Sequence, residues 1–109
     1  MNKIIIEVSV GELLDKISIL EIKKEKIKDT EKLKFINNEY SILKDQLKKN
    51  VKSDEKLNQM YQLLKDLNFK LWEIEDDKRK CEKNKDFGER FIQLSEMCIF
   101  LMIIEQKLN

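Results

Sequence analysis

The sequence contains no proline, no alanine and no histidine, and glycine occurs only at Gly11 and Gly88. Tight β-turns depend on proline and glycine, so their scarcity argues against an all-β fold. Without histidine the chain has no imidazole base, no Ser-His-Asp or Cys-His nucleophile pair and no ordinary catalytic zinc site. The absences therefore exclude several common hydrolytic chemistries.

A marked excess of positive or negative charge is also absent. The chain has 22 basic and 21 acidic residues, a net charge of +1, and its short lysine clusters are interrupted by acidic residues. This balance predicts no nucleic-acid partner. The longest apolar run, 97–104, is far too short to cross a bilayer, so we expect no membrane association.

Two cysteines, Cys81 and Cys98, fit neither a metal-binding spacing nor a CxxC redox motif. We expect them to be buried free thiols in a reducing, cytoplasmic setting. The N-terminal apolar stretch is too short for a signal peptide, and no cofactor motif is present.

What the chain does have is apolar residues at helical spacing, which predicts an all-α fold. A length of 109 residues suits one domain over 1–109. We predict a four-helix bundle-like domain in which the second and third helices form a long antiparallel hairpin. Its expected segments are an N-terminal extended arm at 1–8 and helices at 10–28, 31–49, 54–83 and 87–107.

Capping residues support these boundaries. Ser9 and Glu12 have the capping-box spacing, Thr30 and Asp86 are expected N-caps, and Asn84 suits a left-handed C-cap. The break near Thr30 holds neither glycine nor proline, so a single bent helix is the alternative there.

The apolar residues of the second and third helices alternate in steps of three and four, which is coiled-coil spacing. The first helix is apolar on two sides, and the fourth is apolar all round at 97–104. A helix of this kind needs protein on every side, which predicts a homodimer. The expected interface residues are Ile19, Ile22, Ile99, Phe100 and Ile103.

Trp72 and Arg79 are candidates for binding a partner protein, because Trp and Arg are enriched in interface hot spots. The alternative is that Trp72 belongs to the core.

Paired carboxylates stand one turn apart at Glu12 and Asp15, and again at Glu73 and Asp76. All-helical nucleotide pyrophosphohydrolases build Mg²⁺ sites from such pairs. The spacing also arises by chance in so acidic a chain, so these four residues are metal ligands only under an alternative hypothesis.

Three segments, 8–23 (VSVGELLDKISILEIK), 71–77 (LWEIEDD) and 86–88 (DFG), together resemble an uncharacterised family of short bacterial proteins known only as a domain of unknown function. The resemblance implies a bacterial or phage origin and a helical domain, and it implies no reaction. Where that family continues into a polar Asn-Asp-Arg stretch, this chain has the largely apolar segment 95–101.

The function predicted from the sequence is a non-enzymatic protein–protein interaction or assembly module that self-associates. No catalytic residue and no cofactor is predicted. The alternative is a Mg²⁺-dependent hydrolase of a nucleotide-like phosphate that uses the four carboxylates.

Overall fold

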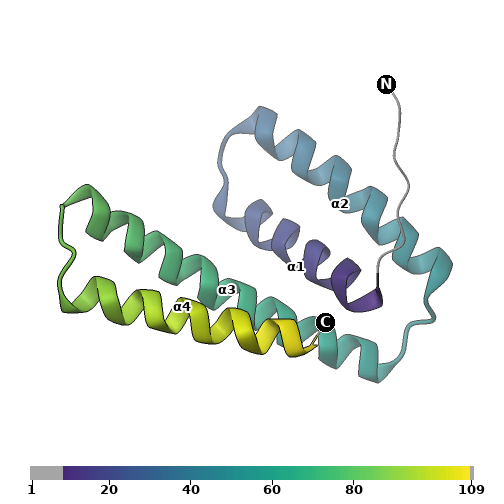
Figure 1. Ribbon diagram of the computed structural model, residues 1–109. Coiled ribbons are helices and arrows are strands. Elements are labelled where there is room, and N and C mark those ends of the chain that lie inside the picture. The colour runs from purple at the N-terminus through teal and green to yellow at the C-terminus, as the bar shows by residue number, and fades with distance from the viewer. Residues whose placement is uncertain (1–8, 109) are drawn as a thin grey trace.

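The computed structural model describes residues 9–108, which form four α-helices joined by short connections (Figure 1). The all-α prediction is confirmed, and the described residues contain no strand. The expected extended arm at 1–8 lies outside them. The helices are α1 (Val10–Lys26), α2 (Thr30–Asn50), α3 (Glu55–Lys83) and α4 (Glu89–Leu108).

The caps explain where the first two helices begin and end. The Ser9 hydroxyl accepts a hydrogen bond from the backbone N–H of Glu12 at 3.1 Å, as the capping box predicts. α1 and α2 are separate helices, because the chain is extended at Ile27. The prediction of Thr30 as the N-cap of α2 is wrong, because the N-cap is Asp29. The Asp29 carboxylate accepts hydrogen bonds from N–H groups in the first turn of α2, and its negative charge suits the helix dipole.

The connection between α3 and α4 differs from the predicted one. Lys85, not Asn84, adopts the left-handed conformation, with φ 56°. The N–H groups of Lys85 and Asp86 donate to the carbonyls of Glu82 and Cys81, which is a Schellman motif. Asp86 is not an N-cap. Its carboxylate accepts from the N–H of Gly88, and α4 begins at Glu89.

The long antiparallel hairpin consists of α3 and α4, so the predicted pairing of the second and third helices is wrong. α2 packs along α1, and α1 in turn packs on α3 (Figure 1). The physical reason is the two-sided apolar character of α1. A helix with apolar residues on two sides buries both only when it lies between two neighbours.

The core follows from this order of helices. The N-terminal part of α3 carries Leu64 and Leu67 beside α1, and its C-terminal part packs against α4. The molecule is elongated, with extents of 48 × 33 × 26 Å. Its buried apolar side chains are Leu14, Ile17, Leu20, Ile22, Ile36, Leu64, Leu67, Ile74, Leu94 and Cys98.

No helix within residues 9–108 is both long enough and apolar enough to cross a lipid bilayer. Even α4, the most apolar of the four, carries charged residues near both ends.

Candidate functional site

α4 uses only one of its sides to pack on α3. Leu94 and Cys98 are buried on that side, and they cluster with Ile74 of α3. Partly buried Leu71, Cys81 and Leu101 complete this contact. Most of the rest of the helix surface is uncovered, because α1 and α2 pack on another side of α3 and α1 approaches α4 only near Glu105 (Figure 1).

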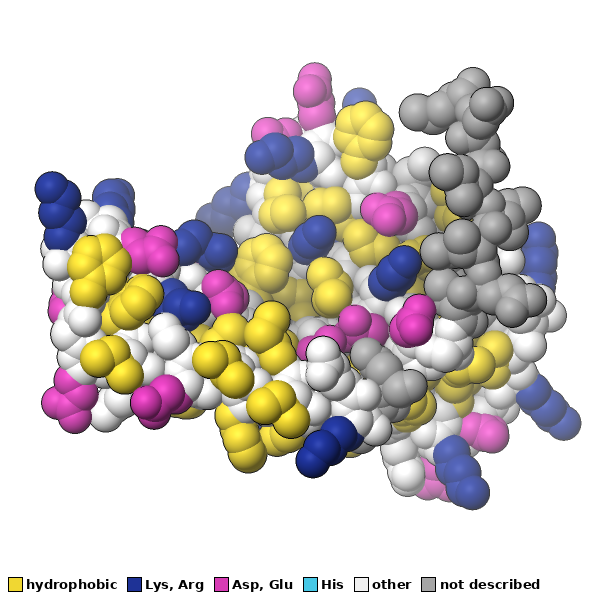
Figure 2. All heavy atoms as spheres, viewed as in Figure 1, with side chains coloured by type: hydrophobic (Ala, Val, Ile, Leu, Met, Phe, Trp, Pro, Cys, Tyr) yellow, Lys and Arg dark blue, Asp and Glu magenta, His cyan; other side chains and the backbone are white. Residues whose placement is uncertain are grey.

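The uncovered side of α4 is strongly apolar. The predicted interface residues Ile99, Phe100 and Ile103 are 60%, 63% and 48% exposed. Figure 2 shows hydrophobic side chains gathered along this helix, with charged side chains towards both ends of the group. Neighbouring Ile92, Met97 and Met102 are also about half exposed. We call these six residues the α4 apolar face. Contiguous exposed apolar surface of this kind is typical of interaction sites.

The other two predicted interface residues lie elsewhere. Ile22 is buried within the chain, with 1% of its surface exposed, so it belongs to the core and not to an interface. Ile19 is half-buried in a groove between α1 and α3. α1 meets two helices of its own chain, and this leaves little of its second apolar stripe for a partner.

Trp72 and Arg79 line the same groove as Ile19, which has a volume of about 280 Å³. Trp72 is half-buried and contributes to the wall of the groove. The Arg79 guanidinium forms an ion pair with Asp76 at 3.2 Å. Both of these side chains are more than half exposed, so the pair adds little to stability and leaves Arg79 available at the surface.

The four carboxylates of the metal hypothesis are not gathered into one site. Glu12, Glu73 and Asp76 are exposed, whereas Asp15 is half-buried and hydrogen-bonded to Asn68 of α3. Within residues 9–108 no group of three or more acidic or cysteine side chains is arranged to hold a metal ion.

A buried polar network joins α1 to α3, and no local pattern in the sequence predicts it. Asn68 is only 7% exposed, and its amide donates to the Asp15 carboxylate at 2.6 Å and to the Ser18 hydroxyl at 2.8 Å. Ser18 in turn donates to the backbone carbonyl of Asp15 at 2.7 Å. A network whose members are all paired fixes the register between two helices, which apolar contacts alone do less strictly.

Glu105 extends this network to α4. Burial, a hydrogen bond with Asp15 and the charge of Asp15 together raise the pKa of Glu105 to about 7. Its Oε2 atom is shielded from solvent and has no hydrogen-bond partner among the described residues. The C-terminal end of α4 therefore lies near α1, and repulsion between the Glu105 and Asp15 carboxylates is relieved when one of them carries a proton.

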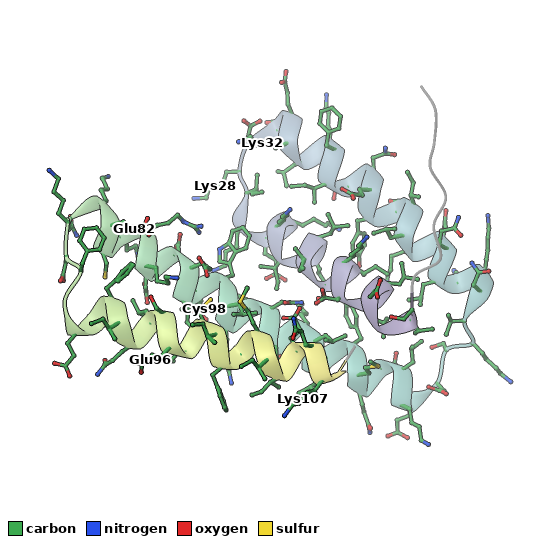
Figure 3. All side chains as sticks on the ribbon, viewed as in Figure 1. Lys28, Lys32, Glu82, Glu96, Cys98 and Lys107 are labelled. Carbon is green, nitrogen blue, oxygen red and sulfur yellow. The ribbon has the colours of Figure 1, made fainter. Side chains whose placement is uncertain are left out.

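The Cys98 thiol lies between α3 and α4 and donates to the Glu75 carboxylate at 2.8 Å (Figure 3). Burial, and then the hydrogen bond to this carboxylate, raise the pKa of the thiol. A thiol with a raised pKa is a poor nucleophile. Both cysteines are free, and Cys98 is a structural residue.

A second polar contact ties α1 to α3. The Tyr61 hydroxyl donates to the Glu21 carboxylate, and the Lys65 ammonium forms ion pairs with Glu21 at 3.1 Å and Glu25 at 3.6 Å. The hydrogen bond to Glu21 raises the pKa of Lys65. The polar groups of this contact pair with one another across the two helices, so we assign it to the fold.

In comparisons with family models, characterised proteins and solved structures, the chain shows no significant match. The resemblance to the bacterial family of unknown function therefore stays a prediction, and the function has to be argued from the surface itself.

Proposed function

We propose that this protein is a non-enzymatic helical assembly module that forms a homodimer through the α4 apolar face. The observation that carries the proposal is the exposure of Ile99, Phe100 and Ile103 on a helix that buries only one side within its own chain. Covering this surface removes apolar area from water, which favours association by about 25 cal/mol per Å².

The size of the face sets the expected strength of the dimer. A 20-residue helix is about 30 Å long and about 10 Å wide, so one helix face offers on the order of 300 Å² per copy. This is less than the roughly 800 Å² per partner of a standard stable interface. We therefore expect a reversible dimer whose population depends on protein concentration. The free thiols suit a reducing compartment such as the cytoplasm.

The test is the solution mass, measured by size-exclusion chromatography with light scattering over a range of concentrations. The mass should rise from 13.1 kDa towards twice that value. Phe100→Ser should keep the protein monomeric, because it removes a large apolar side chain from the centre of the face. Circular dichroism should show unchanged helix content, since Phe100 is 63% exposed in the single chain.

Phe35→Ser is the matched control, because Phe35 is a phenylalanine on α2 that is 78% exposed. This variant should dimerise like the unmodified protein. A monomer at every concentration would overturn the proposal. So would a dimer that Phe35→Ser disrupts and Phe100→Ser leaves intact, since association would then use another face.

A further inference from the structure

The outer side of α4 carries a single row of residues in which charge and apolar surface alternate in a definite order. Glu96, Phe100, Ile103 and Lys107 follow one another in steps of four, three and four, which places them on one line along the helix. All four are exposed. Figure 3 shows Glu96 and Lys107 on the side of α4 that faces away from α3.

The row has an acidic end, an apolar middle and a basic end. Lys107 follows Glu96 by eleven positions, so the two charges stand about 16 Å apart along the helix. Neither side chain takes part in an ion pair within residues 9–108. Both charges are therefore free to meet a charge on another molecule.

Such a row is complementary to a second copy of itself in the antiparallel direction. In a two-fold contact, a residue and the partner residue that it faces lie at equal distances from the symmetry axis. If the axis passes between residues 101 and 102, Glu96 lies opposite the partner's Lys107. Phe100 then lies opposite the partner's Ile103. The same operation gives each of these contacts twice.

Other arrangements of the two α4 helices do not pair the opposite charges of this row. A parallel pair sets Glu96 against the partner's Glu96 and Lys107 against the partner's Lys107, so like charges meet at both ends. An antiparallel pair shifted by one turn brings Glu96 or Lys107 against apolar side chains and leaves a charge to be desolvated without a partner. Antiparallel helices also place opposite dipole ends together.

We propose that a second copy of this chain docks antiparallel on α4, with the two-fold axis between residues 101 and 102. The contact consists of a Phe100–Ile103 centre and two Glu96–Lys107 ion pairs between copies. This inference rests on the proposed homodimer and adds its direction and register, because the proposed function requires only that the α4 apolar face is covered.

Charge reversal tests the register. Glu96→Lys or Lys107→Glu alone creates two like-charge contacts per dimer in place of two attractive ones. Exposed ion pairs contribute about 0.2–1 kcal/mol each, so each single variant should dimerise roughly tenfold more weakly at low salt. The double variant Glu96→Lys/Lys107→Glu should recover the affinity of the unmodified protein, and added salt should reduce all of these differences.

Mixing the two single variants gives the sharpest result. A Glu96→Lys chain is basic at both ends of the row, and a Lys107→Glu chain is acidic at both ends. Equimolar mixing should therefore produce heterodimers in excess of either homodimer, as measured by native mass spectrometry. Glu39→Lys is the matched control, because it makes the same change of charge at an exposed site on α2. It should leave dimerisation unchanged.

The outcomes separate this inference from the proposed function. If the unmodified protein dimerises and Phe100→Ser abolishes the dimer, self-association through α4 stands. If in that case the single charge variants bind themselves as tightly as the unmodified protein does, the antiparallel register is overturned, because a parallel pair also gives an excess of heterodimer on mixing. A protein that stays monomeric throughout overturns both.

Discussion

α1 and α4 differ in burial, and the difference is the reverse of what their compositions suggest. Apolar residues make up seven of the 17 residues of α1 and 12 of the 20 residues of α4. Nevertheless α1 buries Leu14, Ile17, Leu20 and Ile22, whereas α4 buries only Leu94 and Cys98. The number of neighbouring helices, not the number of apolar residues, decides how much of a helix is buried. α1 lies between two helices, and α4 lies at the edge of the molecule.

The comparison indicates that packing around α1 governs the stability of the single chain, whereas the α4 apolar face concerns association with a second molecule. The packing around α1 holds the chain together at any concentration, because its contacts lie within one molecule. Under the proposed dimerisation, the α4 apolar face contributes to stability only when a second molecule is present. A substitution in either region should therefore reveal its role by whether its effect depends on protein concentration.

The largest effect is expected from Ile17→Ala in α1. Ile17 is fully buried, and its truncation leaves a cavity between α1 and its neighbours. The free energy of unfolding should fall by about 2–5 kcal/mol. Urea unfolding followed by circular dichroism measures this at two protein concentrations, and the loss should be the same at both.

The matched variant Ile99→Ala makes the same truncation at a residue that is 60% exposed. In dilute solution its effect should stay within about 0.5 kcal/mol. If the two variants lose equal stability in dilute solution, the contrast between α1 and α4 is wrong.

A smaller effect on stability is expected at Glu105, where α4 meets α1. Glu105 has a pKa of about 7 in the folded protein, against 4.5 for an unperturbed group. Between pH 4.5 and pH 7 the folded state therefore holds a proton that the unfolded chain releases. The contribution of Glu105 to the free energy of unfolding is greatest below pH 4.5 and is lost as the pH rises to 7. Asp15 faces Glu105 from α1, and neutral Asn68 lines the same hollow from α3.

Glu105→Gln should remove this pH dependence and make the protein more stable than the unmodified chain above pH 7. Thermal unfolding at several pH values measures the difference between the two proteins. Glu82→Gln, at an exposed site near the end of α3, should leave the profile unchanged. Parallel pH profiles for the unmodified chain and Glu105→Gln would show that the contact with Asp15 does not form.

The smallest effect is expected at the turn that positions α4 on α3. Lys85 adopts a left-handed conformation that costs a residue with a side chain roughly 1–2 kcal/mol and costs glycine little. Lys85→Gly should therefore raise the unfolding temperature and add about 1 kcal/mol of stability.

Lys83→Gly is the comparison for this turn, because Lys83 is the last residue of α3 and is helical. Glycine there should lower stability by about 0.5–1 kcal/mol. If both substitutions destabilise the protein, the left-handed position has been assigned to the wrong residue.

Helix positions were predictable from the sequence because they depend on local signals. The apolar spacing and the polar breaks placed every helix boundary within two residues of those in the structure, although Thr30 and Asp86 are not the N-caps. The pairing of helices was not predictable in the same way. Three helices carry apolar stripes of similar spacing, and nothing in that spacing states which stripe meets which.

The same limit explains which parts of the candidate site the sequence analysis found. The apolar residues at 97–104 occupy every side of the helix, and this pattern can be read from one short segment. It therefore predicted exposed apolar residues on α4. The hydrogen bond between Asp15 and Asn68 joins residues 53 positions apart, so it depends on α1 packing against α3. Glu105 gave no signal either, since a carboxylate near the end of a helix is ordinary until its neighbours are known.

The order of the helices also has a consequence for how the chain folds. α1 with α2, and α3 with α4, each pair neighbours in the sequence, and the main contact between distant segments of residues 9–108 is that of α1 with α3. Chains dominated by contacts between sequence neighbours fold in microseconds to milliseconds. We expect each hairpin to form rapidly, so that the slowest event is the meeting of α1 with α3, where the Asp15–Ser18–Asn68 hydrogen bonds select the correct alignment.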